Sequence, residues 1–393
     1  MLNRELYMNK LVQWQGHKVI KVVTGVRRCG KSTLLTMFAH KLQEQGTKPE
    51  ACISINFEDI AFEELREYHK LYEYIINKLQ KGAINYIFLD EIQLVPQFEK
   101  AIDSLYIRDD VDIYITGSNA YLLSSELATL LSGRYIEINM LPFSFKEYYT
   151  LVGGDKRTAF VNYYRKGGFP YTTRLADDET YREYVNGIYS TVLLKDIVGR
   201  KNIADVGLLE AIIAFMFDNI GNIVSVKKIA DTLTSYGRKT SAATVSTYIT
   251  ALKDAYIIYK AERYDVKGKQ YLQSLEKYYL VDMSFRELLL GSRTMDIGHI
   301  LENIVYLELL RRGYQINVGK VGTAEVDFVA KKGDEKIYYQ VSASILDSHT
   351  REREFAALRA VKDNYPKFVL TMDDLPMGEN GILQKNIIDF LLE

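Results

Sequence analysis

The stretch Gly25-Val26-Arg27-Arg28-Cys29-Gly30-Lys31-Ser32 decides the fold of this chain, because it is a complete G-x-x-x-x-G-K-S phosphate-binding loop. The preceding residues 18–24, KVIKVVT, are rich in β-branched side chains and predict a strand. Residues 33–40, TLLTMFAH, predict a helix. A strand before the loop and a helix after it are the context that this motif requires. We therefore expect the loop to bind the phosphates of a nucleotide.

Each part of the loop has a chemical role in this hypothesis. The glycines let the backbone wrap around phosphates, and the helix N-terminus offers unpaired N–H donors to an anion. Lys31 is expected to reach the β- and γ-phosphates. The hydroxyl of Ser32 is expected to bind Mg²⁺.

A second segment supplies the acids that hydrolysis requires. Residues 86–93, YIFLDEIQ, begin with four apolar residues, which is typical of a buried strand in a parallel sheet. Asp90 ends this run and is expected to hold Mg²⁺ through water. Glu91 follows directly and is the candidate base that orients the attacking water.

A further strand is predicted over residues 111–116, VDIYIT, and it is followed by Gly117-Ser118-Asn119. A polar residue at this strand end can sense the γ-phosphate or hold the water, and Ser118 and Asn119 are the candidates. Simple turn chemistry explains the same residues equally well, since Gly, Ser and Asn all favour turns.

The composition indicates an ordinary globular protein of two or three domains. The chain has 393 residues, 47% hydrophobic and 26% charged residues and a formal net charge of −1. Its two cysteines, Cys29 and Cys52, form no CxxC pair, and with no secretory or membrane-spanning segment they predict a cytoplasmic protein without a membrane partner. Cys29 lies in the loop, where it is either an oxidation-sensitive thiol or a small filler.

The order of these motifs resembles the AAA-type ATPases of the archaeal and STAND-related branch. Besides the loop, the Asp-Glu pair and TGSN at 116–119, the resemblance is carried by LSGR at 131–134 and LPFSFKEY at 141–148. It covers residues 1–200 and implies, for that domain, a parallel α/β sheet of the additional-strand P-loop kind.

The resemblance implies roles for residues outside the loop. Arg134 matches a finger arginine that acts on a neighbouring subunit of a homo-oligomer; its alternative is an ion pair with a local carboxylate. Pro170, in GGFP at 167–170, matches an element that contacts the base and sugar, or else belongs to a plain turn. We expect the nucleotide to be bound by Gly25, Val26, Arg27, Arg28, Cys29, Gly30, Lys31, Ser32, Thr33 and Pro170. We expect catalysis to depend on Glu91, Lys31, Asn119 and Arg134, and Mg²⁺ to be held by Ser32 and Asp90.

Residues 201–285 read as three short helices followed by a hairpin, at 206–219, 226–235, 242–253 and 255–272. This order resembles the winged-helix domain that follows the ATPase in this branch. Residues 226–272 hold nine Lys or Arg against four acids, and such a local excess is typical of phosphate contacts. The third helix exposes mainly Ser and Thr, which are poor base readers. Nonspecific DNA binding through Arg238, Lys239, Lys267 and Lys269 and a role as a lever for the ATPase therefore both stay open.

Residues 286–393 predict a helix at 298–312, strands at 315–318, 325–330 and 336–342, a helix at 349–363, a strand at 367–371 and a last helix at 382–392. This α/β order resembles the PD-(D/E)xK restriction-endonuclease-like domains. Glu302 and Asp327 match two acids of that family, but Gln340 and Ser342 stand where active nucleases have E-x-K. Two-metal cleavage needs the missing charge, so we expect a catalytically degenerate domain.

These observations together predict an Mg²⁺-dependent ATPase that couples its nucleotide state to the winged-helix and C-terminal domains. In one form of this hypothesis the protein acts while bound to DNA. A STAND-like regulatory switch that holds its nucleotide is the alternative. An ATP-dependent nuclease is a further one, which the residues at 340 and 342 disfavour.

Overall fold

The computed structural model describes residues 2–118, 131, 133–199, 203, 205–266, 268, 270–291 and 297–393. By compactness these residues form two units. The first unit comprises residues 1–140 with the short segment Asp254–Tyr256, and the second comprises Leu141–Lys253 with Ile257–Glu393. The predicted division of the chain at residues 200 and 285 stays a prediction.

The first unit is built on a five-stranded, fully parallel sheet with the strand order β2-β3-β4-β1-β5. Its strands are β1 (Ile20–Thr24), β2 (Cys52–Asn56), β3 (Asn85–Asp90), β4 (Val111–Gly117) and β5 (Tyr135–Asn139). The predicted strands before the loop, before Asp90 and before Ser118 are confirmed as β1, β3 and β4. Because all strands run in one direction, the ends of β1, β3 and β4 meet at one edge of the sheet.

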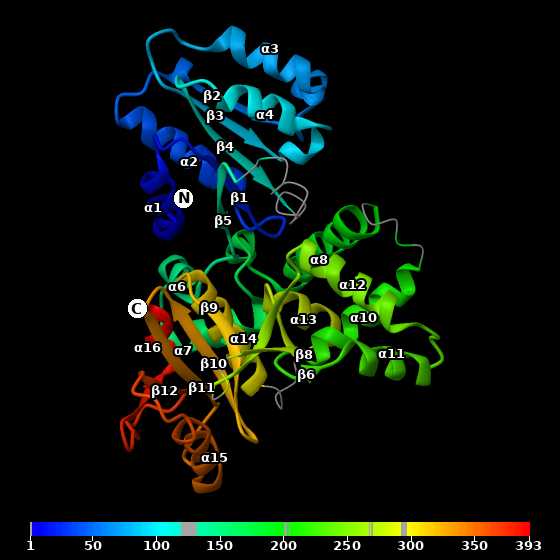
Figure 1. Ribbon diagram of the computed structural model, residues 1–393, viewed down its shortest axis with the longest axis vertical. Coiled ribbons are helices and arrows are strands. Elements are labelled where there is room, and N and C mark those ends of the chain that lie inside the picture. The colour runs from blue at the N-terminus through cyan, green and yellow to red at the C-terminus, as the bar shows by residue number, and fades with distance from the viewer. Residues whose placement is uncertain are drawn as a thin grey trace. The chain divides into compact units, whose positions relative to one another are not determined.

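Helices cover both faces of this sheet, which explains its apolar strands (Figure 1). Helices α3 (Tyr68–Lys78) and α4 (Phe98–Tyr106) pack on one face, against isoleucines and leucines of β1 to β4. Helices α1 (Glu5–Trp14) and α2 (Lys31–Glu44) belong to the other face. There the ring of Phe38 lies 6.3 Å from Phe88 and 5.1 Å from Tyr114, measured between centroids. Burying Phe38 contributes roughly 2–3 kcal/mol to stability, which fixes the helix that follows the loop.

Short 3₁₀ segments connect these elements: η1 (Pro49–Ala51), η2 (Ile60–Arg66) and η3 (Ile92–Leu94). The last of them begins directly after Glu91, whose backbone is left-handed with φ of +56°. A non-glycine residue in this conformation is uncommon and is often found at functional sites.

The second unit begins with a series of helices. They are α6 (Phe145–Val152), α7 (Lys156–Lys166), η5 (Pro170–Arg174), α8 (Asp178–Thr191), the π-helix η6 (Val192–Val198), α10 (Val206–Asp218), α11 (Val226–Ser235) and α12 (Ala242–Asp254). Side chains cap the first turns of α6, α7, α8, α10 and α11. Ser144 and Glu147 form a reciprocal capping box at α6, and Ser225 caps α11. The three helices predicted over 206–253 are confirmed.

The rest of the second unit is a mixed eight-stranded sheet with the order β13-β12-β11-β10-β9-β7-β8-β6. Its strands are β6 (Ile223–Val224), β7 (Ile258–Asp265), β8 (Gln270–Leu280), β9 (Gln315–Val321), β10 (Ala324–Lys332), β11 (Glu335–Val341), β12 (Lys367–Thr371) and β13 (Ile382–Asn386). The predicted hairpin is confirmed as β7 and β8, and β7 also pairs in parallel with β9. One sheet therefore continues across residue 285.

Two sets of helices sandwich the C-terminal strands. Helix α15 (Ser348–Arg359) packs Phe355 and Leu358 against one face of β10 to β12. Helices α14 (Ile297–Arg311) and α16 (Ile387–Leu392) lie on the other face, where Tyr306 contacts the Phe328 ring and Phe390 contacts Tyr339. Helix α13 (Met283–Leu290) links the hairpin to α14.

The helix predicted over residues 382–392 is wrong in its first half. Residues Ile382–Asn386 instead form β13, which pairs in parallel with β12. The helix begins only at Ile387, because the Asn386 side chain accepts a hydrogen bond from the Ile388 backbone N–H at 2.8 Å. A short apolar run is compatible with a helix or a strand, and residues Ile382–Asn386 form a strand here because they pair with the edge of β12.

Candidate nucleotide site

The loop between β1 and α2 has the backbone that tight wrapping requires. Gly25 has φ of +138°, and a Cβ there would lie 2.1 Å from the carbonyl oxygen of Met140, so only glycine fits. Gly30 is left-handed with φ of +106° and is the N-cap of α2. Ser32 and Thr33 follow in the first turn of α2, and both are exposed. The helix N-terminus and two hydroxyl groups thus face solvent beside the loop.

Lys31 lies inside the loop rather than on its surface. Its side chain is buried, and its Nζ donates hydrogen bonds to the carbonyl oxygens of Gly25 at 2.9 Å and Val26 at 3.2 Å. The loop backbone therefore places this ammonium at its own centre, as a phosphate-binding lysine requires.

Asp90 and Glu91 lie at the end of β3, and both are buried. One hydroxyl of β4 orients them: Thr116 Oγ1 donates to Asp90 Oδ1 at 2.5 Å and accepts the Glu91 backbone N–H at 2.9 Å. Burial raises the pKa of Asp90, and hydrogen bonds from Thr116 and Ser32 offset part of that effect. The structure thus brings together Ser32 and Asp90, the two residues predicted to hold Mg²⁺.

The Glu91 carboxylate stays ionised although it is buried. Burial alone would raise its pKa, but the Lys31 ammonium, the hydrogen bonds from Gln93 and Ser118, and the charge of Arg27 together lower the pKa. Its Oε2 accepts hydrogen bonds from the Gln93 side chain and, at 3.0 Å, from Ser118 Oγ. A charged carboxylate at this place can act as a hydrogen-bond acceptor or base.

Of the two candidates at the end of β4, Ser118 is buried in the site and Asn119 lies outside the described residues. Sequence reasoning missed Thr116 and Gln93. A threonine at the end of the strand beside the Asp-Glu strand was the available signal for Thr116. No comparable signal in the sequence pointed to Gln93.

The arginines of the loop and Cys29 have local roles in the structure. Arg27 forms an ion pair with Glu58 at 2.8 Å, and Arg28 is exposed in a left-handed conformation with φ of +68°. Cys29 is fully buried, and the buried Arg4 donates to its carbonyl oxygen at 3.0 Å. Burial raises the pKa of the Cys29 thiol, which favours its role as a small filler over that of a reactive thiol.

Arg134 lies outside this group of residues, and Pro170 belongs to the other unit. Arg134 is half-exposed and forms an ion pair with Asp103 at 3.5 Å; its guanidinium lies 5.3 Å from the Tyr106 ring centroid. This is the local pairing that was the alternative to a finger. Pro170 belongs to the second unit and begins η5, where its fixed φ suits the first residue of a helical turn.

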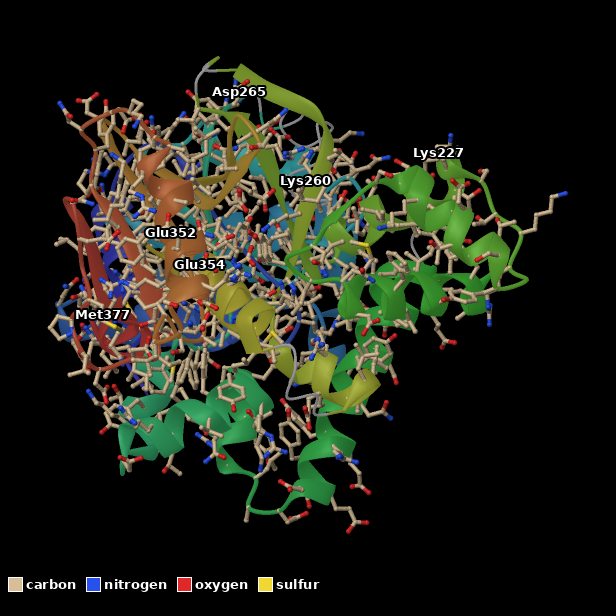
Figure 2. The ribbon with its side chains drawn as sticks, turned by 90° about the horizontal axis from the view of Figure 1, so that it is seen from below. Lys227, Lys260, Asp265, Glu352, Glu354 and Met377 are labelled. Carbon is tan, nitrogen blue, oxygen red and sulfur yellow. The ribbon has the colours of Figure 1, made fainter. Side chains whose placement is uncertain are left out.

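The second unit carries the exposed basic residues predicted for DNA. Lys227 and Lys228 begin α11, and Lys227 lies on the outside of this helical segment (Figure 2). Arg238 and Lys239 are exposed in the connection to α12. Lys260 is neutralised by Glu262 and Glu276, at 2.9 and 3.0 Å. Lys267 and Lys269 lie outside the described residues.

Two family models match the sequence. One is an AAA domain, over residues 17–149, and the other is a domain of unknown function (DUF8612), over residues 157–296. The chain is 39% identical over 400 residues to an uncharacterized protein of Haemophilus influenzae, a match that covers 100% of this chain and 99% of that protein. It is 33% identical over 370 residues to the uncharacterized protein MJ1544 of Methanocaldococcus jannaschii, covering 88% and 79%.

Solved structures are similar at a lower level. The Walker-type ATPase PABY2304 of Pyrococcus abyssi has a TM-score of 0.49 at 18% identity, covering 74% of this chain and 96% of that one. The Orc1 protein of Aeropyrum pernix in complex with DNA has a TM-score of 0.30 at 12% identity, covering 79% and 94%. None of the helices in the described part of the chain is long and apolar enough to cross a membrane.

Proposed function

We propose that this chain, which carries an AAA domain over residues 17–149 and belongs to one family with the Haemophilus influenzae and Methanocaldococcus jannaschii proteins, binds and hydrolyses ATP with Mg²⁺. The observation that carries the proposal is the convergence of Lys31, Ser32, Asp90 and Glu91 at one edge of a parallel sheet. Ligands of open α/β sheets bind at this edge, outside the carboxyl ends of the strands.

The residues at this edge fit Mg²⁺ and ATP. A hydroxyl and a carboxylate, those of Ser32 and Asp90, are hard oxygen ligands of the kind that Mg²⁺ prefers, and they are already in hydrogen-bond contact. When bound, Mg²⁺ neutralises charge on the phosphate oxygens. Lys31 and the N–H groups of the loop hold the phosphates in place. Glu91, fixed by Ser118 and Gln93, orients the water that attacks the terminal phosphoryl group.

Equilibrium binding of ATP tests the nucleotide part of this proposal. Lys31→Ala is expected to weaken binding at least tenfold, because it removes the one ammonium held at the centre of the loop. Lys41→Ala, in the last turn of the same helix, is the matched control and is expected to bind normally. Equal affinity of Lys31→Ala and the wild type would contradict the proposal.

A nucleotide-dependent switch of STAND type is the second candidate function. It is favoured by one observation: the Glu91 carboxylate is already engaged by two hydrogen-bond donors, Ser118 and Gln93, which can hold it away from a water. A tightly bound nucleotide in the purified protein, together with negligible turnover, would support the switch. Rapid turnover with exchangeable nucleotide would support the ATPase.

We further propose that residues 206–280 form a winged helix. The support is the element order α10-β6-α11-α12-β7-β8, in which β8 pairs with both β6 and β7. Its exposed basic residues favour phosphate contacts without base reading, since α12 exposes Ser246, Thr247 and Thr250. Without DNA, the same segment would act as a lever moved by the ATPase.

The salt dependence of DNA affinity distinguishes these two roles. If Arg238 and Lys239 contact phosphates, Arg238→Ala/Lys239→Ala reduces the slope of log affinity against log salt by about 1.8, at about 0.9 per contact. Lys260→Ala is the control, because that lysine is already paired with two acids. An unchanged slope in the double variant would leave only the lever.

Arg134 is proposed as a finger on a neighbouring copy of the chain, which requires that it leave Asp103. The ATPase rate per chain then rises with protein concentration, and it falls in Arg134→Ala at high concentration only. A rate independent of concentration would leave Arg134 with its local ion pair.

A further inference from the structure

A buried cluster of charges surrounds Lys277 of β8 in the second unit. Lys277 is 4% exposed, and three carboxylates converge on its Nζ. The distances are 2.9 Å to Glu302 Oε1, 3.0 Å to Glu325 Oε1 and 3.7 Å to Asp327 Oδ1. The ammonium comes from the hairpin, whereas the acids come from α14 and β10.

Further contacts fix the carboxylates in this arrangement. Glu302 Oε1 also accepts the hydroxyl of Tyr279 at 2.6 Å, and that tyrosine ring stacks on Tyr306 with 4.2 Å between centroids. Asp327 lies at a β-bulge, where the register of β10 against β9 shifts between Val326 and Val329. A bulge re-aims side chains, and Asp327 Oδ2 accepts the Val341 backbone N–H at 2.9 Å.

Glu302 and Asp327 are the acids that resemble a nuclease metal site, but Gln340 and Ser342, the other two residues of that resemblance, offer no free ligand to a metal ion. The side-chain oxygen Oε1 of Gln340 accepts the Asp327 backbone N–H at 3.2 Å, and Nε2 of the same side chain donates to Glu354 at 2.8 Å. Ser342 Oγ donates to the Ser344 carbonyl oxygen at 3.1 Å. Gln340 and Ser342, which stand at the E-x-K position of active nucleases, are thus both engaged in hydrogen bonds within the fold. Within the described ranges no group of three or more His, Cys, Asp or Glu is arranged to hold a metal.

We propose that the Lys277 ammonium is the resident cation of this cluster and occupies the space beside Glu302 and Asp327 that a divalent ion would need. The cluster consequently takes up no divalent metal, and the C-terminal part of the chain does not cleave DNA. Its role is to hold the hairpin strand β8 against α14 and β10, and so to join the segments before and after the predicted domain boundary at residue 285. This inference does not rest on the proposed ATPase function.

Electrostatics support this assignment. Burial alone would lower the pKa of Lys277, but the charges of Glu302, Asp327 and Glu325 raise it above its usual value, so the side chain stays an ammonium. The same ammonium, with the hydrogen bond from Tyr279 and His299 Nδ1 at 3.7 Å, lowers the pKa of Glu302 against the effect of burial. A buried charge of this kind is tolerated only with partners, and removing one partner leaves the others uncompensated.

Binding of Mn²⁺ to nucleotide-free protein tests the proposal, with thermal unfolding and the electron spin resonance signal of free Mn²⁺ as readouts. The change in unfolding temperature caused by Mn²⁺ is expected to be the same in the wild type and in the single variant Asp327→Asn. Lys277→Met is expected to lower the unfolding temperature by roughly 10 °C. Mn²⁺ at about 100 times its Kd is expected to restore about 5 °C, because the ion takes the place of the ammonium.

Two further variants make the test specific. Lys277→Met/Asp327→Asn is expected to lose the rescue by Mn²⁺, and Lys260→Met, the matched control on neighbouring β7 (Lys260 is labelled in Figure 2), is expected to show neither the large loss nor the rescue. If Lys277→Met does not fold, Lys277→Met/Glu325→Gln keeps the charge balance and the pair Glu302 and Asp327. Binding of Mn²⁺ to the wild type that Asp327→Asn abolishes would overturn the proposal. So would a folded Lys277 variant that Mn²⁺ does not stabilise.

Discussion

Removing the hydroxyl of Thr116 is predicted to weaken the first unit and its nucleotide site together. In Thr116→Val the side chain keeps its shape but loses the group that donates to Asp90 and accepts from the Glu91 backbone. Thr116 is fully buried, so water cannot replace either bond. An unpaired buried N–H costs about 1–3 kcal/mol, and a hydrogen bond to a charged group contributes about 1.5–3 kcal/mol. Because the two effects overlap at one atom, we expect a loss of about 2–4 kcal/mol in the free energy of unfolding.

The single tryptophan of the chain, Trp14, lies in α1 and so reports on the first unit. Denaturant unfolding followed by its fluorescence measures the loss directly. Thr36→Val is the matched control: its exposed hydroxyl donates to the Ser32 carbonyl oxygen at 3.0 Å, and we expect a change below about 0.5 kcal/mol. If Thr116→Val unfolds within about 0.5 kcal/mol of the wild type, the hydroxyl does not hold the two acids as described.

Three further outcomes follow from the contacts. Glu91→Gln is expected to bind ATP but to hydrolyse it roughly 10²–10⁴-fold more slowly, and wild-type turnover would refute its role as base. Gly167→Ala is expected to destabilise the second unit in thermal unfolding, because a Cβ would lie 1.7 Å from Asp282 Oδ1. Gly154→Ala is the control, since Gly154 has a similar φ of +79° but open space around it, and a smaller loss is expected there. Equal losses in the two variants would contradict the steric argument. Burial raises the pKa of Asp282 to about 6, so the folded state holds this proton more tightly than the unfolded state and stability falls as pH rises from about 4 to 6. Asp282→Asn should remove that part of the slope, and an identical slope in both proteins would show that Asp282 does not titrate there.

Local spacing was enough to predict the loop, its flanking strand and helix, and the Asp-Glu strand end. The reason is that each of these features lies within a few residues of sequence, and a parallel sheet then brings its strand ends to one edge. The hydrogen bonds of Thr116 to Asp90 and Glu91 were not predicted, because they depend on the register between β3 and β4. Register is set by packing over the whole sheet rather than by the residues of one strand.

Long-range contacts explain the remaining differences. Lys277 and Asp327 are separated by 50 residues, so no sequence motif contains both. Lys277 also lies between the basic segment 226–272 and the C-terminal domain 286–393, so neither pattern includes it. Residues 382–386 were assigned to a helix because their composition does not show that β12 has an open edge to pair with. In both cases the deciding partner lies outside the local run of residues, and it becomes visible only in the folded chain.

The rate of phosphate release from ATP is the sharpest test of the proposed ATPase activity. We expect turnover by the wild type that requires Mg²⁺ and is abolished in Lys31→Ala, whose ammonium is held by the loop carbonyls of Gly25 and Val26. Lys41→Ala should turn over like the wild type. Phosphate release by Lys31→Ala at the wild-type rate would contradict the account.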